Sequence, residues 1–312
     1  MFSGIHSYIS RAAGSAVLLL FTCCSNQDLE PTIADGMVKS FCATSTDWIP
    51  EPDATRALDV DPVTGGLAFS WALGDVLGIY PIGGDQVSFP ISDGAGSKEA
   101  KFDGGSWALR AAVQYAAYYP FNAANYHIAQ TEIPVSLIGQ TQDGNNSLRT
   151  ASSFDFQAAA ATTPNSNGSV MLSFQHLCSF MKLKLTVQKP GTYTHVKVTS
   201  DNAPFGTKAK YDLTLETPYL MATETSASVE MDLNNITTMS DDELVTIYCL
   251  AVPTDLSGSK LSIELTDSNG KIHKSAEDVS GKTMVAGHMY GYAASIAITG
   301  TGGTGEDIDP EE

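Results

Sequence analysis

Apolar side chains recur at every second position along most of this chain, and the spacing that marks an amphipathic helix is almost absent. The alternation is clearest in four segments, Lys182–Val187, His195–Thr199, Ser228–Leu233 and Leu261–Leu265. Successive side chains of a strand point to opposite faces, so each segment has one face for a core and one for water. Many short strands between turns rich in Gly, Asn, Asp and Pro favour sheet packed on sheet. The sequence therefore predicts an all-β protein.

The first half of the chain has the same pattern in a more broken form. The expected strands there are Leu67–Trp71, Val76–Pro81, Gln86–Ile91, Glu99–Phe102, Gln114–Tyr119 and Ile133–Ile138. Residues 141–167 are mostly polar, so we place a domain boundary near Asn165. The chain is long enough for two domains, and we expect β-sandwiches over 57–165 and 166–299. The Gly, Thr and acidic residues of 300–312 have no apolar row, which predicts a flexible acidic tail.

The first two dozen residues predict export as a lipoprotein. Arg11 precedes an apolar run over residues 12–21, about half the ~20 residues that a membrane-spanning helix needs. Cys23 and Cys24 stand where the signal peptide, residues 1–23, would be cleaved, as in the bacterial lipobox. The acylated cysteine, carrying palmitate-like chains, would tie the protein to a membrane. The sequence does not decide between the two cysteines, and an ordinary secretory signal with two incidental cysteines is the alternative.

Charge and cysteine content exclude several classes of partner. The net charge is −18, with 17 Lys and Arg against 35 Asp and Glu, and no basic patch is present to release the counterions of a nucleic acid. Beyond the signal only Cys42, Cys178 and Cys249 remain, an odd number whose spacing matches no zinc motif. We therefore expect no disulfide framework, no metal site and no nucleic-acid partner.

Candidate catalytic residues are scarce. The histidines form no His-x-His or helical pair, and no nucleophile elbow, P-loop or dinucleotide fingerprint is present. We place His195 and His273 on wet strand faces, and we expect no enzyme and no cofactor. Exposed aromatic rings bind sugars by stacking, and Trp48, Trp107 and the pair Tyr118-Tyr119 are candidates. A surface lipoprotein adhesin that binds glycans or host matrix without polymerising is therefore an alternative function.

Six local patterns, in their order along the chain, resemble the fimbrillin family, the lipoprotein-derived subunits of type V pili. They are Thr55-Arg56, the run Leu67–Trp71, Gly74-Asp75 before Val76–Tyr80, Tyr115–Pro120, Phe174-Gln175-His176, and Ala286–Tyr290. No single pattern is specific, and their order over residues 56–298 carries the resemblance. The resemblance implies two tandem transthyretin-like β-sandwiches, a place at the cell outer membrane or in a fimbrium, and other pilus subunits as partners.

The resemblance also implies a mechanism of assembly. An arginine-specific protease removes the N-terminal segment, here 24–56, and a strand of another subunit takes the vacated place by β-augmentation. Met37–Thr44 is the expected removable strand, and the link Ser45–Thr55 leads to Arg56 as the expected cleavage site. The alternative is that Arg56 is an uncut, solvated residue at a strand start.

The position of the subunit in a filament is a separate question. No apolar row follows Ile298, so the chain lacks the strand material that a stalk subunit donates. A tip or accessory subunit fits better than a stalk subunit, and a fimbrillin-like lipoprotein that never polymerises fits as well.

Overall fold

The computed structural model describes residues 37–50, 67–105, 108–110, 114–165 and 169–298. Cys23, Cys24, Arg56 and the acidic tail lie outside the described residues. The regular secondary structure of the described chain is almost entirely strand, and its two helices are short 3-10 turns, η1 (Ala123–Asn125) and η2 (Ala151–Phe154). The all-β prediction is confirmed. None of the helices in the described part of the chain has the length and apolar character needed to cross a membrane.

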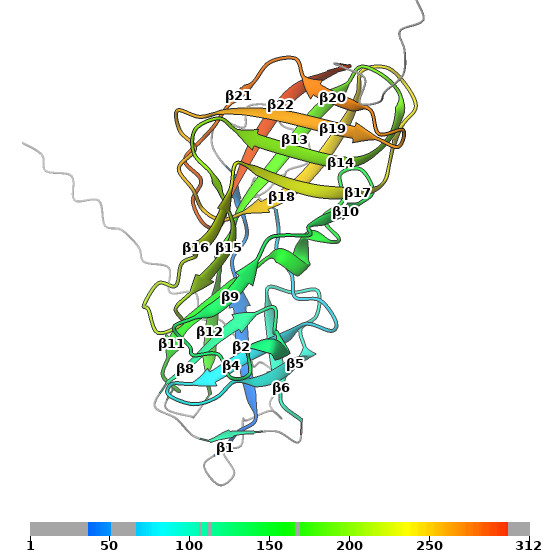
Figure 1. Ribbon diagram of the computed structural model, residues 1–312. Helices are drawn as coiled ribbons and strands as arrows, with labels where there is room; N and C mark the ends of the chain where they lie inside the picture. Colours follow the sequence, from blue (N-terminus) through cyan, green and yellow to red (C-terminus); the bar gives the residue numbers. More distant parts are fainter. Residues whose placement is uncertain (1–36, 51–66, 106–107, 111–113, 166–168, 299–312) are drawn as a thin grey trace, which may run out of the picture. The chain divides into compact units, whose positions relative to one another are not determined.

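Seven strands form a closed barrel (Figure 1), and the core of this barrel is rich in aromatic side chains. In barrel order they are β11 (Gln157–Thr162), β12 (Met171–His176), β2 (Ser40–Ser45), β6 (Glu99–Asp103), β5 (Val87–Asp93), β4 (Val76–Pro81) and β8 (Tyr115–Tyr119). Their inward side chains include Phe41, Phe89, Phe102 and Phe174, and Trp71 packs with them from the chain before β4. Closure leaves no strand with an unpaired edge, so each barrel strand, β2 included, has a neighbour on both sides.

Most of the remaining strands belong to a ten-stranded sheet. Its main path runs β10 (Thr141–Asp143), β17 (Ser228–Thr238), β14 (Gly191–Ser200), β19 (Lys260–Asp267), β20 (Ile272–Ser275), β22 (His288–Ile298), β13 (Ser179–Val187) and β18 (Glu243–Ala251). Off this path, β21 (Val279–Ser280) pairs with β19 and β3 (Ile49–Pro50) pairs with β22. Along β17 the buried Met231 and Leu233 alternate with the exposed Glu230 and Asp232, as the sequence pattern predicts.

Two small sheets complete the described structure. One joins β16 (Met221–Ser226), β15 (Phe205–Tyr211) and β9 (Ile133–Ser136), and the other joins β1 (Met37–Val38) to β7 (Leu109–Arg110). Ile133 and Val135 of β9 and Ala209 and Tyr211 of β15 lie in a core that also contains Tyr118 of the barrel and Leu250 of β18.

Side-chain amides cover the outer edge of β18. Three amides each accept a hydrogen bond from a backbone N–H of β18 and donate one to a backbone carbonyl of β18. They are Gln140 against Leu250, Gln142 against Tyr248 and Thr246, and Asn145 against Thr246 and Leu244, all at 2.7–2.9 Å. The backbone of the same segment pairs with β17 as β10. Residues 140–145 therefore pair with β17 through their backbone and bond the outer edge of β18 through their side chains, which blocks pairing of β18 with another chain there.

Most predicted strands are confirmed, and Leu67–Trp71 is wrong. Only Leu67 makes a bridge, to Trp48. Phe69 and Trp71 pack against the barrel core, but their backbone N–H groups donate to the Asp47 carboxylate and to the carbonyl of Ser97 instead of to a strand ladder. Trp71 is fully buried there and its indole N–H donates to the carbonyl of Lys98.

The domain boundary near Asn165 stays a prediction. Strand β12 follows that boundary in the sequence and pairs within the barrel, whereas β9 and β10 precede it and pair with β15 and β17.

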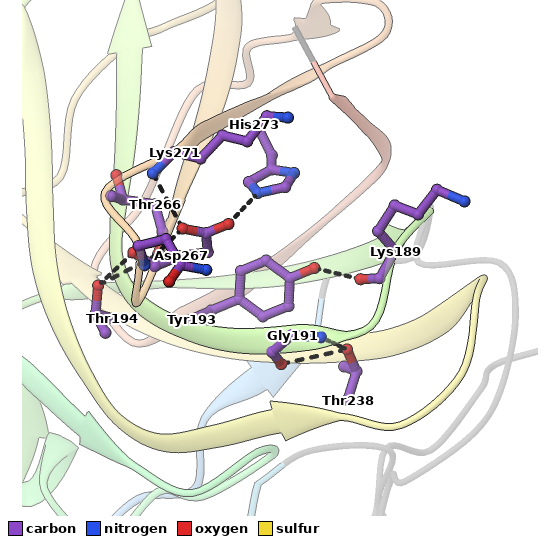
Figure 2. Close-up of polar contacts among 10 residues, drawn as sticks. Lys189, Gly191, Tyr193, Thr194, Thr238, Thr266, Asp267, Lys271 and His273 are labelled. Carbon is purple, nitrogen blue, oxygen red and sulfur yellow. Dashed lines mark hydrogen bonds and ion pairs between the residues drawn. The ribbon is translucent and has the colours of Figure 1, made fainter. Parts of the chain in front are cut away.

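At the turn between β19 and β20 the structure differs from the sequence prediction for His273 (Figure 2). His273 was expected on a wet face, but it is buried, with its Nε2 3.0 Å from Oδ2 of Asp267 and its ring edge-on to Tyr193. The other carboxylate oxygen of Asp267 accepts hydrogen bonds from the backbone N–H groups of Asn269 and Lys271. His195, also expected on a wet face, is partly exposed beside Asp232. The error at His273 arises because alternation shows which residues of β20 share a face but not which face is buried, and His273 lies on the buried one.

Candidate functional site

Strand β2 is the N-terminal strand that the sequence analysis marked as removable, and it is fully integrated in the barrel (Figure 1). On one side it pairs antiparallel with β6, with Phe41 opposite Phe102. On the other side it pairs in parallel with β12, with Cys42 opposite Met171. Removing β2 would leave the facing backbone groups of both neighbours without partners, and such groups are strong sites for a new strand.

The buried side chains of β2 are closely surrounded by other residues of the barrel core. Phe41 is 1% exposed, and its ring meets the rings of Phe89 and Tyr115 edge to face, with centroids 5.0 and 5.2 Å apart. Ala43 is completely buried against the same core. Burying one large apolar side chain contributes about 1.5–3 kcal/mol, so the site requires a large ring at the position of Phe41 and a small side chain at Ala43.

A chain of buried polar groups holds the residues at the end of β2. Ser45 Oγ donates to Gln157 Oε1 at 2.6 Å, and Gln157 Nε2 donates to Asp155 Oδ2 at 3.0 Å. The other carboxylate oxygen of Asp155 lies 2.7 Å from Nδ1 of His176, whose Nε2 lies 2.9 Å from the carbonyl oxygen of Thr46. A carbonyl oxygen only accepts, so Nε2 carries a hydrogen and its N–H donates a hydrogen bond to the carbonyl oxygen of Thr46.

Trp48 covers the imidazole of His176. The two rings stack with centroids 4.0 Å apart and an interplanar angle of 27°, and Phe180 meets the indole edge to face. The side chain of Trp48 is therefore buried, although it lies in the proline-rich link where exposure was a natural expectation. As a platform for sugar stacking, this indole has no free face.

Asp47 adds an ionic contact between the same segment and the barrel. Its carboxylate pairs with Lys98 and accepts a hydrogen bond from the N–H of Phe69 at 2.9 Å. Burial alone would raise the pKa of Asp47, but the hydrogen bonds from Lys98 and Phe69 outweigh it and lower the pKa below its ordinary value. Asp47 is therefore held as a carboxylate at neutral pH.

Beyond Asp47 the segment makes its last described contacts with the large sheet. Ile49 N donates to the carbonyl of Gly287, and Ile49 and Pro50 pair in parallel with His288 and Met289 of β22. Pro50 is the last residue described before Leu67, and the predicted cleavage residue Arg56 lies in the stretch between them. Apart from the peptide link through residues 51–66, the segment from Ser40 to Pro50 is held to the barrel and the large sheet by noncovalent contacts.

A cavity of about 350 Å³ lies beside this segment. Trp48, Phe69, Tyr119 and Phe180 contribute aromatic walls, and the exposed Arg149 lies among its lining residues. Arg149 is in the connection between β10 and η2, which agrees with its prediction as a loop residue.

The three described cysteines are buried, and none of them is in a disulfide. Burial raises the pKa of the Cys249 thiol to about 12 and raises that of Cys178 as well, so both are protonated and unreactive at neutral pH. Among the residues for which the structure gives positions, no group of three His, Cys, Asp or Glu side chains is arranged to hold a metal ion.

The sequence predicted strand β2 but not the residues that hydrogen-bond to the end of this strand. Asp155 and Gln157 lie in the stretch that the sequence presented as polar and irregular, and only the Phe-x-His pattern drew attention to His176. No local signal connects these residues to Ser45 and Thr46, which are more than 100 positions away. Of the predicted site residues, Cys23, Cys24 and Arg56 all lie outside the described residues, so the structure brings none of them together.

These features define a β-protein whose N-terminal strand completes a closed barrel. A family model described as Fimbrillin-like matches residues 55–307. The chain therefore belongs to the fimbrillin-like family, whose members are proteins of the cell surface. No curated protein matches the chain.

Two solved structures support the fold assignment. A proposed cell adhesion protein from Bacteroides ovatus is 16% identical with a TM-score of 0.54, and the alignment covers 83% of this chain and 94% of that one. A second proposed cell adhesion protein, from Bacteroides uniformis, is 16% identical with a TM-score of 0.52 and coverages of 85% and 94%. At this level of identity the likeness shows the fold alone.

Proposed function

We propose that this protein is a fimbrial subunit, exported as a lipoprotein acylated at Cys23 or Cys24, that assembles by exchanging its first barrel strand. Cleavage after Arg56 would separate the segment that contains β2 from the rest of the chain. A strand of another subunit would then take the place of β2. A tip or accessory position, accepting a strand without donating one, agrees with the low β propensity of the residues after Ile298.

The observation that carries this proposal is the position of β2. It precedes every other barrel strand in sequence, so one cut downstream frees it without interrupting the remaining barrel strands. It also has a hydrogen-bonded neighbour on each side and a buried aromatic anchor. A replacement strand would recover both ladders and the burial of the anchor, which is the source of affinity in β-augmentation.

The proposal is tested by exposing the purified chain, mixed with other subunits of the same fimbria, to an arginine-specific protease. The unaltered chain should be cut after Arg56 and then form heat-stable oligomers with partner subunits. Arg56→Ala should stay full length and monomeric. Arg149→Ala, which changes an exposed loop arginine, is the matched control and should be processed at Arg56 like the unaltered chain. Assembly that proceeds unchanged in Arg56→Ala would contradict the proposal.

A second candidate is an adhesin that binds glycans or host matrix, favoured by the aromatic cavity beside Trp48. Its volume of about 350 Å³ falls within the usual range of ligand pockets. Because the indole of Trp48 has no free face, Phe69 and Tyr119 would be the contacting rings and Arg149 the polar anchor. Binding to immobilised glycans that is lost in Arg149→Ala would support this function, and equal binding by both proteins, or no binding by either, would contradict it.

A further inference from the structure

The segment after β2 and the body of the protein form a closed circuit of hydrogen bonds. It begins at the hydroxyl of Ser45, passes through Gln157, Asp155 and His176, and returns to the carbonyl of Thr46, the next residue. Pairing β2 with β6 and β12 does not need this circuit, because the ladders use backbone groups only. The hydrogen-bond circuit therefore recognises groups of the bound segment that backbone pairing of a strand does not involve.

Two residues further on, the indole of Trp48 closes over the same imidazole. It is only 4% exposed, and the second wall of its site is Phe180. The body thus presents three adjoining features, an amide that takes a hydroxyl, an imidazole N–H that takes a carbonyl, and an aromatic slot. Any extended chain supplies the carbonyl, whereas only certain side chains supply the hydroxyl and the ring.

We propose that His176, Asp155 and Gln157 form a recognition site for the end of whichever strand occupies the β2 position. The partner that fits is an extended peptide with a hydroxyl side chain at the place of Ser45 and an aromatic ring three residues later. This inference rests on the proposed function, because it specifies the chemistry of the strand that is exchanged. It also means that cutting the chain between residues 51 and 66 leaves its own segment bound until a better-matched strand competes.

The physical basis of selection is the burial of the site. A strand without the hydroxyl leaves Gln157 Oε1 facing the site without a donor, and an unsatisfied buried acceptor is costly. A strand without the ring leaves the imidazole face and Phe180 uncovered. Each omission should weaken binding by about tenfold or more.

The test uses the full chain with a site for a sequence-specific protease inserted between residues 51 and 66. After the cut, fluorescent synthetic peptides of residues 37–50 are added in excess, and their uptake is followed by anisotropy. Peptides with Ser45→Ala or Trp48→Ala should bind about tenfold more weakly than the native peptide. A Lys39→Ala peptide, altered at an exposed side chain, is the control and should match the native one.

A variant of the body separates recognition from a merely structural role. With the His176→Gln body, the loss of peptide affinity caused by Trp48→Ala should be at least about threefold smaller than with the unaltered body, because the indole then has no imidazole to stack on. His195→Gln, a partly exposed histidine on β14, should leave the penalty unchanged. If His176→Gln does not fold, the peptide comparison with the unaltered body decides alone.

Equal affinity for all four peptides would overturn this inference and leave strand exchange standing. A full penalty for Trp48→Ala in a folded His176→Gln body would overturn it as well. Failure to take up any peptide would overturn it together with the proposed exchange of β2. Arg56 has no part in this experiment, so a chain that is never cut naturally at Arg56 would not affect the result.

Discussion

The ring of Phe41 on β2 lies edge to face against the ring of Phe89 on β5, with centroids 5.0 Å apart and planes at 82°. This pair connects β2 to a strand that is separated from it in the barrel by β6. It makes Phe41 the anchor of a strand that we propose is exchanged, so the stability of the barrel and the ease of exchange should depend on the same side chain.

Phe41→Ala should lower the free energy of unfolding by about 3–5 kcal/mol, the usual cost of deleting a buried phenyl ring. Urea denaturation of the uncut chain measures it. Lys39→Ala, at an exposed position just before β2, should change the stability by less than about 0.5 kcal/mol. Equal small effects of the two substitutions would show that β2 contributes little to the barrel.

The pH dependence of the protein's stability should reflect the ionisation of the Asp267 carboxyl group. Burial alone would raise the pKa of this carboxyl, but hydrogen bonds from His273 and from the backbone of Lys271 and Asn269 lower it below the ordinary value (Figure 2). A lowered pKa means that the carboxylate stabilises the fold above the unfolded-state value of about 3.9 and loses this effect as pH falls through the folded-state value.

Asp267→Asn should therefore melt at a lower temperature than the unaltered chain at pH 7, and the difference should narrow as pH falls toward 3. Thermal unfolding followed by circular dichroism at several pH values is the measurement. Asp241→Asn, at an exposed acid that forms only a 3.8 Å pair with Lys189, is the control. A difference that stays constant from pH 7 to pH 3 would contradict the assignment.

The side-chain amides of Gln140, Gln142 and Asn145 along the outer edge of β18, called the amide ladder below, can be tested by substitution. Gln142→Glu keeps the shape and the acceptor for Tyr248 N–H but removes the donor to the Thr246 carbonyl, which lies 2.9 Å away. The carboxylate would face that carbonyl in a buried place, so we expect a loss of about 1–3 kcal/mol. Gln130→Glu, on a part-buried amide that bonds the carbonyls of Pro81 and Gly84, is the comparison and should cost less. Unchanged stability in Gln142→Glu would show that the amide ladder does not support the edge.

Lipidation is predicted from the sequence alone. Changing Cys23 and Cys24 together to Ser should abolish labelling by a clickable palmitate analogue and release the protein from the membrane fraction, because no acyl chain can then be attached. Single changes identify the acylated residue. Labelling that persists in the double variant would contradict the lipoprotein assignment.

The parts of the fold that were predictable are those with one wet face. Ser228–Leu233 alternates strictly because Met231 and Leu233 face the core while Glu230 and Asp232 face water, and β17 follows this pattern. Leu67–Trp71 has equally suitable residues, yet they fill the end of the barrel, and a local pattern does not distinguish the two uses. Closure of the barrel and the amide cover of β18 depend on partners more than 80 residues apart, so no window of sequence contains them.

The candidate site divides in the same way. Met37–Thr44 was recognisable as a strand, and the structure has Met37–Val38 and Ser40–Ser45 in sheets. The hydrogen-bond circuit was not predictable from the sequence. It joins three separate segments, residues 45–46, 155–157 and 176, and one of its acceptors is a backbone carbonyl, which has no side-chain signature.

The central claim is that this subunit enters a fimbria only after its first strand has been cut away and replaced. N-terminal sequencing of the protein from isolated fimbriae tests it most directly. The account predicts a free N-terminus at Ala57, with the segment through Arg56 absent from the filament. An acylated Cys23 or Cys24 at the N-terminus of the assembled protein, with β2 still attached, would contradict it.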